Sequence, residues 1–93
     1  PERKLKYRIK SIEKTFKIKY EEYEKMQKEQ NNLCFICNQP ETSSKNNYLC
    51  VDHNHETNKI RGLLCNSCNR GLGYFKDNIE LLKNAQNYLE IKN

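Results

Sequence analysis

The residues whose types and order could support chemistry lie in one stretch, from Cys34 to Asn69. Asp52, His53 and His55 stand near its middle, and Asn69 closes it. A neutral histidine can accept a proton from water near pH 7, and a carboxylate with an amide oxygen can hold a hydrated Mg²⁺. Hydrolysis of a phosphodiester needs both, an activated water and a cation beside the phosphate. An Asp-His pair in a turn is also often only part of a polar surface.

Two Cys-x-x-Cys pairs enclose the Asp-His segment. Cys34 with Cys37 and Cys65 with Cys68 offer four thiolates, the ligand set of a tetrahedral Zn²⁺ bound at about 2.3 Å. Four thiolates leave no open coordination position, so the predicted zinc site is structural. The 27 residues between Cys37 and Cys65 exceed the roughly 15–20 of a simple zinc ribbon, which indicates an insertion. An iron–sulfur cluster, another metal or two redox-active dithiols are the alternatives.

Hydrophobic periodicity predicts helices on both sides of the cysteine-bounded stretch. A thin apolar seam runs through the N-terminal segment, and Tyr and Met mark one face of the next. A further helix is expected to start at the second cysteine pair, with Asn66 or Ser67 as its N-cap, and the last helix is expected to begin at Asp77. The four expected helices span residues 2–19, 20–31, 65–75 and 77–91.

Two short strands are expected inside the stretch, over residues 48–51 and 60–64, separated by a turn. A single metal that ties the base of this hairpin to the following helix would bring Asp52, His53 and Asn69 into one small cleft. The sequence therefore predicts that the zinc site and the polar residues depend on each other.

Composition indicates a small domain whose hydrophobic core needs a further source of stability, such as a bound metal. The chain has 93 residues, of which 35% are hydrophobic and 31% charged, and it has no Trp. Such a chain buries a small core, which a bound metal commonly supplements. An odd number of cysteines and the lack of a long apolar run favour a metal in a reducing compartment. We expect an intracellular protein, cytoplasmic or encoded by a virus, that is neither secreted nor membrane-bound. Cys50, outside both pairs, is expected to be a small buried residue.

Positive charge is concentrated at the N-terminus. Residues 1–19 hold eight Lys or Arg against two Glu, a net charge of +6, whereas the remainder has nine basic and ten acidic residues. A basic arm on a near-neutral body is typical of nucleic-acid binding, and a merely solvated face is the alternative. The arm's basic residues are Arg3, Lys4, Lys6, Arg8, Lys10, Lys14, Lys17 and Lys19.

The joint order of these motifs resembles a known family. Cys-x-x-Cys, then Val-Asp-His-Asn-His, then Arg-Gly-Leu-Leu-Cys-Asn-Ser-Cys-Asn-Arg-Gly-Leu-Gly is similar to the recombination endonuclease VII family of His-Me finger (HNH, ββα-metal) nucleases. The resemblance covers roughly residues 20–89. It implies a small α+β, zinc-stapled domain with a ββα-metal core and flanking helices at both ends. One domain over residues 1–93 is expected, with a basic helical arm at 1–19, a zinc-clipped nuclease core at 20–76 and a C-terminal helix at 77–93.

The resemblance implies a metal-dependent endonuclease that hydrolyses DNA with one Mg²⁺ or Mn²⁺ and leaves 5′-phosphate ends. Asp52 and Asn69 match the ligands of the catalytic metal, and His53 matches the general base. His55 matches a second histidine whose role the resemblance leaves open. Cys34, Cys37, Cys65 and Cys68 match the zinc ligands. The expected DNA phosphate contacts are Arg61 and Arg70, which flank the proposed site, and Arg3, Lys4, Lys6, Arg8 and Lys10 of the arm.

Two departures from the family limit what is carried over. Residues 70–73 read Arg-Gly-Leu-Gly where the best-known junction resolvase of the family has a Glu, and the long C-terminal regions that build its dimer are not seen. Both departures argue against Holliday-junction resolution, and the expected reaction is then nicking or double-strand cleavage of DNA. The partner beyond DNA stays open between a second copy and a larger host protein. The alternatives are a non-catalytic zinc module that binds nucleic acid or protein, and a ubiquitin-ligase-like module, which would need two complete four-ligand sites.

Overall fold

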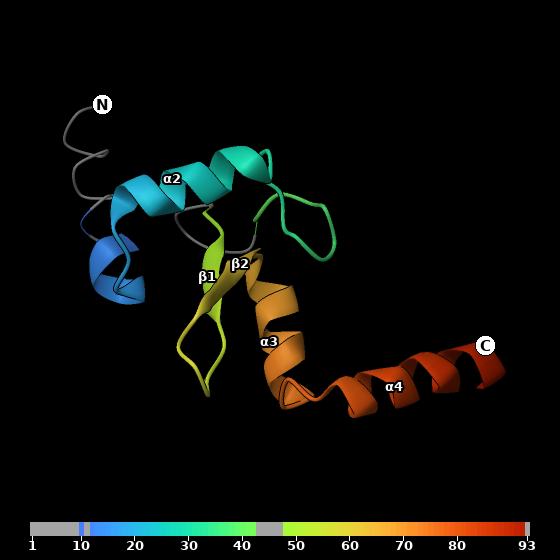
Figure 1. Cartoon of the computed structure of the whole chain (residues 1–93). Helices are drawn as coiled ribbons and strands as arrows, with labels where there is room; N and C mark the ends of the chain where they lie inside the picture. The colour runs from blue at the N-terminus through green and yellow to red at the C-terminus, as the bar shows by residue number, and fades with distance from the viewer. Residues whose placement is uncertain (1–9, 11, 43–47, 93) are drawn as a thin grey trace.

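The chain forms a two-stranded sheet surrounded by helices, a small α+β arrangement (Figure 1). The structure is a computed structural model that describes residues 10, 12–42 and 48–92. Residues 12–16 are helical and precede the labelled elements. In chain order these are α2 (Tyr20–Glu29), β1 (Cys50–His53), β2 (Ile60–Leu64), α3 (Asn66–Tyr74) and α4 (Ile79–Lys92).

Strands β1 and β2 pair antiparallel as a hairpin whose register shifts once. Asp52 pairs with Gly62, but the next residue, His53, pairs with Ile60. Arg61 is therefore an extra residue on β2, a β-bulge that locally changes the direction of its strand. The sequence predicted β2 correctly, whereas β1 begins two residues later than expected and includes Asp52 and His53.

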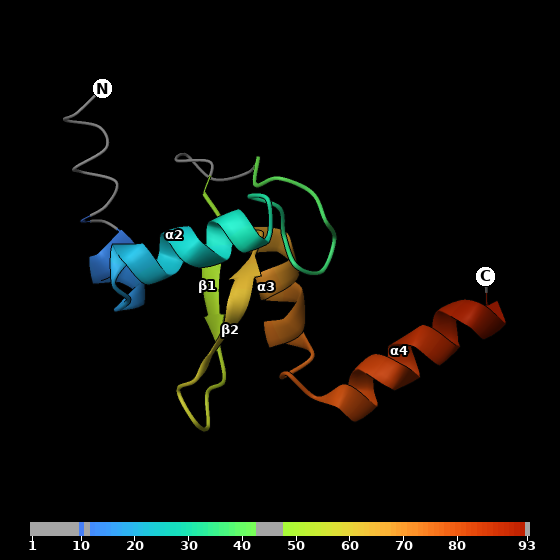
Figure 2. The same ribbon diagram turned by 45° about the horizontal axis from the view of Figure 1, so that its top comes forward.

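Helix α2 lies across the hairpin in both ribbon views (Figures 1 and 2). Its side chain Tyr23 is fully buried, and the Tyr23 hydroxyl donates a hydrogen bond of 2.7 Å to the carbonyl of Leu49 just before β1. Glu21 and Glu22 in the first turn favour the helix dipole. The helix ends where Asn31 and the residue after it take positive φ values of 55° and 57°, close to the predicted end.

A small core joins these elements. Ile12 is fully buried and Phe16 packs against the core, so the apolar seam predicted for the N-terminal helix is confirmed where the structure describes it. Leu5 and Ile9 of the same seam lie outside the described residues. The buried hydrophobic residues are Ile12, Ile18, Tyr23, Cys34, Leu49, Val51, Leu63, Leu64 and Cys65.

Gln30 fastens three segments to one another. Its Nε2 donates to the carbonyls of Leu33 and Leu63, both at 2.9 Å, and its Oε1 accepts from the Leu63 N–H at 3.0 Å. Gly62 permits this approach, because a Cβ at that position would lie 3.3 Å from the Gln30 Oε1. One side chain thus supplies three hydrogen bonds between the end of α2, the first cysteine loop and β2.

The N-terminus of α3 is capped by Cys65, which corrects the predicted cap at Asn66 or Ser67. The Cys65 sulfur accepts a hydrogen bond from the Cys68 N–H at 3.4 Å. The buried Glu41 carboxylate accepts from the Asn66 N–H. A negative group at this end of a helix is favoured by the helix dipole.

Helix α4 is capped by Asn78 rather than by Asp77. The Asn78 Oδ1 accepts from the Leu81 N–H at 3.0 Å, while Asp77 points back toward the hairpin. The described residues of α4 are not buried, and the helix extends away from the body (Figure 2). Its exposed apolar side chains include Ile79, Leu89 and Ile91. Within the described part of the chain, no helix has the length and apolar character needed to cross a membrane.

Replacement of Gln30 by Ala should destabilise the zinc-loaded protein by roughly 1–3 kcal/mol, because the Leu63 N–H and the Leu33 carbonyl lose their Gln30 partner in a partly buried place and the Leu63 carbonyl loses one of its two donors. The free energy of unfolding would be measured by denaturant titration with zinc in excess. Gln27→Ala is the matched control, since the Gln27 side chain donates a hydrogen bond to the exposed Asn32 side chain, and should cost less than about 0.5 kcal/mol. Equal losses for the two variants would contradict the role of Gln30.

Candidate functional site

The two cysteine pairs converge on one point. Sγ atoms of Cys34, Cys37, Cys65 and Cys68 all lie within 4.8 Å of one another. Four sulfurs around a tetrahedral Zn²⁺ with bonds of about 2.3 Å would be roughly 3.8 Å apart, and the Cys37 and Cys65 sulfurs are 3.8 Å apart. The residues present therefore fit a metal of the size and softness of zinc.

The electrostatics of the cluster also favour a cation. Burial raises the pKa of the Cys34 thiol, but hydrogen bonds from nearby backbone N–H groups outweigh burial and lower that pKa to about 6. Burial raises the pKa of Cys65 above the usual value although hydrogen bonds with Cys68 oppose this, and burial together with the neighbouring sulfurs raises the pKa of Cys68. One thiolate thus forms readily, and further ionisation needs a positive charge among the sulfurs.

Cys50 stands apart from the cluster. It opens β1, is half-buried, and does not belong to the four-sulfur group. Burial, followed by repulsion from Glu41, raises the pKa of its thiol. The residue therefore remains a neutral thiol at neutral pH, close to the small buried residue that the sequence predicted.

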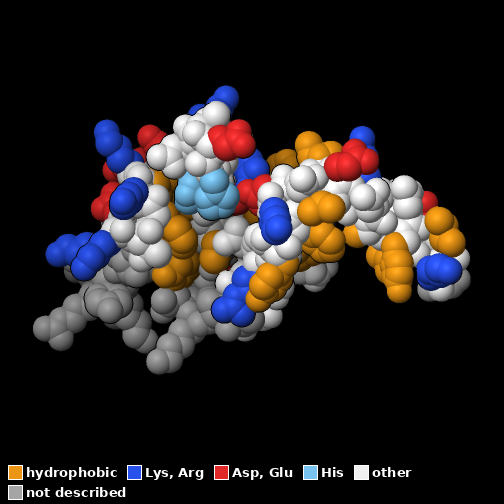
Figure 3. Space-filling view, turned by 90° about the horizontal axis from the view of Figure 1, so that it is seen from below, with side chains coloured by type: hydrophobic (Ala, Val, Ile, Leu, Met, Phe, Trp, Pro, Cys, Tyr) orange, Lys and Arg blue, Asp and Glu red, His pale blue; other side chains and the backbone are white. Residues whose placement is uncertain are grey.

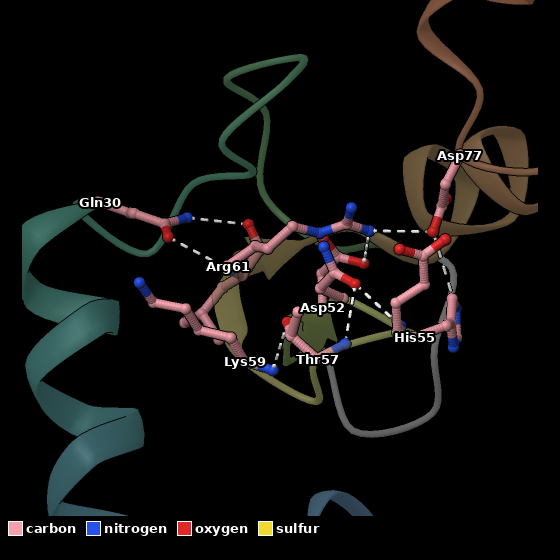
Figure 4. A network of polar contacts seen from close by, with 10 residues as sticks. Gln30, Asp52, His55, Thr57, Lys59, Arg61 and Asp77 are labelled. Atoms are coloured by element: carbon pink, nitrogen blue, oxygen red, sulfur yellow. Dashed lines mark hydrogen bonds and ion pairs between the residues drawn. The ribbon is translucent and has the colours of Figure 1, made fainter.

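A chain of charged contacts runs from β1 to the start of α4 (Figure 4). Arg61 binds Asp52 through two hydrogen bonds, Nε to Oδ2 at 2.7 Å and Nη2 to Oδ1 at 3.0 Å. The same Nη2 lies 3.2 Å from the Asp77 Oδ2, and the His55 Nε2 lies 3.8 Å from that oxygen. Figure 4 shows Arg61 extended between the two carboxylates. The network connects the hairpin to the α3–α4 junction.

The bulge makes the Asp52–Arg61 pair possible. Successive strand residues normally point to opposite faces, yet Asp52, Arg61 and Gly62 line the same hollow. The extra residue on β2 breaks the alternation and lets the guanidinium reach the carboxylate. The Asp52 side chain is only 11% exposed. Its hydrogen bonds with Arg61 raise the pKa of the guanidinium above the ordinary value.

His53 lines a different hollow from Asp52. This second hollow is also lined by Phe16, Asn58 and Ile60. The rings of His53 and His55 are 5.3 Å apart, and the histidines form one surface patch in Figure 3. The His53 ring thus lies close to the His55 ring, whose Nε2 is near the Asp77 carboxylate.

The remaining residues predicted for the site are Asn69, Arg70 and those of the basic arm. Asn69 is half-buried on α3, where its backbone N–H bonds to the Cys65 carbonyl at 3.0 Å, and α3 packs against β1. Arg70 and Lys10 are exposed. The remaining arm residues named as DNA contacts, Arg3, Lys4, Lys6 and Arg8, lie outside the described residues.

Asp77 belongs to the site but was not expected there. Asp before a helix is typical of an N-cap, so the sequence predicted that role for Asp77 and not its contacts with Arg61 and His55. It adopts a φ of 53°, which Asp tolerates better than most residues. This backbone conformation turns the carboxylate toward the hairpin and leaves the cap to Asn78. Nothing in the local sequence distinguishes the two arrangements.

The oxygen donors fit a hard divalent cation in type. Asp52 offers a nearly buried carboxylate and Asn69 an amide, which are ligands that Mg²⁺ and Mn²⁺ prefer. Both Asp52 oxygens bond to Arg61 in this state. A cation that used this carboxylate would therefore compete with the guanidinium.

Comparison with known proteins identifies a family. A family model for recombination endonuclease VII matches residues 9–91. The Gene 59 protein of Mycobacterium phage D29 is 42% identical over 76 residues, and that of Mycobacterium phage L5 is 41% identical over 76 residues. Each match covers 81% of this chain and 45% of the relative, so the chain spans less than half the length of these proteins. No solved structure matches the chain significantly.

Removal of one sulfur should remove the zinc. Cys37 is an exposed member of the cluster, so Cys37→Ser changes packing little and tests the metal. We expect about one zinc per chain in the natural protein and less than half as much in this variant, with loss of cooperative unfolding because metal binding is coupled to folding. Zinc content by atomic emission and thermal unfolding by circular dichroism are the measurements.

Cys50→Ser is the matched control for that experiment, since Cys50 is outside the four-sulfur cluster. It should retain one zinc per chain. Full zinc binding by Cys37→Ser, or zinc loss in Cys50→Ser, would show that the ligand set is assigned incorrectly.

Proposed function

The chain belongs to the recombination endonuclease VII family, and we propose that it is a metal-dependent DNA endonuclease with a His-Me finger site. The observation that carries the proposal is the network around Asp52. A nearly buried carboxylate, two histidines and an arginine gather on one hairpin, and four cysteines that could hold a metal bring the loop after α2 to the junction of β2 with α3. Titratable side chains that converge in one place are typical of functional sites.

In the proposed mechanism each side chain has one task. His53 accepts a proton from the attacking water, for which its half-exposed position and adjacent His55 ring are suited. Asp52 and Asn69 would hold a Mg²⁺ or Mn²⁺. When bound, this ion supplies positive charge at the scissile phosphate and the leaving oxygen. Cleavage of the bond to the 3′ oxygen would leave 5′-phosphate ends.

Arg61 is proposed to change partners during the reaction. In the free chain it neutralises Asp52, which keeps a nearly buried carboxylate paired. Asp77 offers the same guanidinium a second carboxylate at 3.2 Å. Release of Asp52 would therefore leave Arg61 anchored beside the site, where a planar guanidinium suits a DNA phosphate. Arg70 and the basic arm would add salt-sensitive contacts that do not depend on sequence.

A second candidate is a non-catalytic zinc module that binds nucleic acid. It is favoured by the Asp52–Arg61 pair itself, because a fully paired carboxylate needs no cation. Gel shifts beside cleavage assays separate the two candidates. Binding without cleavage across several divalent metals would support the module.

Supercoiled plasmid should be nicked by the natural protein with Mg²⁺ or Mn²⁺, and His53→Ala should reduce the rate by roughly 10²–10⁴-fold, the usual contribution of a general base. Agarose gels over time give the rate. The variant must match the natural protein in zinc content and circular dichroism. Equal rates for the two proteins, or no nicking by either, would refute the proposed nuclease.

Asp52→Ala and Asn69→Ala should each lower metal-dependent cleavage while zinc stays near one per chain. The reason is that these oxygens serve the second cation and not the cysteine cluster. Asn87→Ala, an exposed amide on α4, is the matched control for Asn69 and should cleave normally. Loss of zinc from either site variant would show that the two metal sites had been confused.

Arg61→Ala should bind Mn²⁺ more tightly, by roughly fivefold, because the competing guanidinium is gone. Paramagnetic resonance of free Mn²⁺ measures the affinity without any cleavage. The same variant should cleave more slowly, since a phosphate contact is lost. Lys59→Ala removes an exposed charge two residues away and should leave Mn²⁺ affinity unchanged. Unchanged or weaker binding in Arg61→Ala would contradict the exchange of partners.

A further inference from the structure

A hollow of about 260 Å³ adjoins the Asp52–Arg61 pair. One part of its lining is ionic and is formed by that pair. The remainder is formed by Gly62 and by apolar side chains from three segments, the first cysteine loop, β2 and α3. These apolar residues are Phe35, Ile36, Leu64 and Leu72. An apolar wall beside a charged group is the pattern of a ligand site.

Phe35 and Ile36 are largely exposed to solvent, so they contribute little to the hydrophobic core. Phe35 is 75% exposed and Ile36 is 54% exposed, although both are large apolar residues. They occupy the two positions between Cys34 and Cys37, at the tip of the first cysteine loop. An aromatic ring that is left in solvent beside a charged hollow is suited to contact a ligand.

The loop that carries Phe35 is held in place. The Phe35 N–H donates to the Leu63 carbonyl at 3.1 Å, and the Ile36 N–H donates to the Cys34 sulfur at 3.4 Å. The Asn38 N–H closes the loop on the Cys34 carbonyl at 2.9 Å. Gln30 bonds to the same Leu63 carbonyl. The ring is therefore presented by a fixed backbone, which reduces the entropy cost of binding.

We propose that this hollow is a stacking subsite for one nucleobase of the DNA strand, next to the phosphate bound at Arg61. The inference rests on the proposed function and adds a substrate contact to it. A nucleotide matches both parts of the hollow, since its base offers a flat apolar face and its phosphate a charge for the guanidinium. An apolar peptide would instead cover the Asp52–Arg61 pair without replacing its lost hydration.

The DNA bound at this subsite must offer an unstacked base. Within a paired helix each base face is covered by its neighbours, so a base against Phe35 must have one face free. Single strands and strand ends offer such bases directly. Stacking on an aromatic side chain tolerates any base, because every base has a π face. The subsite would thus recognise an unstacked nucleotide and carry no sequence preference.

The chain contains no Trp, which allows a direct test. Phe35→Trp places a single indole at the hollow. The zinc-loaded variant, in a His53→Ala background in which cleavage is expected to be slow, would be titrated with oligothymidylate in the presence of Mg²⁺, and its fluorescence recorded. A matched oligomer whose sugars carry no bases is the second probe. We expect strong quenching by the base-bearing oligomer and little by the abasic one, because only the former can stack on the indole.

Tyr88→Trp is the matched control, since Tyr88 is an aromatic side chain that is 59% exposed on α4. Its indole should be quenched little by either oligomer. Phe35→Ala provides a second measurement and should weaken oligothymidylate binding roughly fivefold or more. Tyr88→Ala should not. Zinc content confirms that each variant is folded.

The outcomes separate the subsite from the nuclease. Equal quenching by the two oligomers, equal quenching at positions 35 and 88, or unchanged affinity in Phe35→Ala would each overturn the subsite, even if plasmid is cleaved. Base-dependent quenching at position 35 together with weaker binding by Phe35→Ala would support it. If those results came with no cleavage under any metal, the nuclease proposal would fail while the stacking subsite stood.

Discussion

Convergence of four sulfurs is the constraint on which the other features of the molecule depend. The pairs that meet within 4.8 Å come from the loop after α2 and from the junction of β2 with α3. The core that accompanies them is small, and several of its buried members are themselves next to cysteines. In a chain of this composition, a metal bound by the four sulfurs would supply much of the free energy of folding. The position of the loop after α2 against the junction of β2 with α3 depends on that one centre.

The sequence predicted the features that depend on spacing. Paired cysteines identified the metal cluster, and apolar periodicity identified α2, β2 and α4 with ends close to those observed. It did not predict features that depend on backbone detail. The bulge at Arg61 and the positive φ of Asp77 have no signature in residue type. Together they form the network around Asp52, so the partners of that carboxylate could be learned only from the structure.

In the proposed function, Asp52 would have two alternative cationic partners. A carboxylate that is 11% exposed requires a positive partner. Arg61 serves as that partner in the free chain, with Asp77 as its second contact. A divalent ion is expected to serve in the proposed working state. Because Arg61 already contacts both carboxylates, the proposed exchange would need only a small movement of one side chain.

The bulge also determines where this chain can tolerate changes in length during evolution. Five residues of β2 face four of β1. Deletion of one residue between Ile60 and Leu64 would either restore regular alternation, which turns a guanidinium away from Asp52, or shift Leu63 and Leu64 out of the core. The turn between His53 and Ile60 lies outside this constraint. Relatives should therefore differ in the length of that turn far more readily than in the length of the strand that follows it.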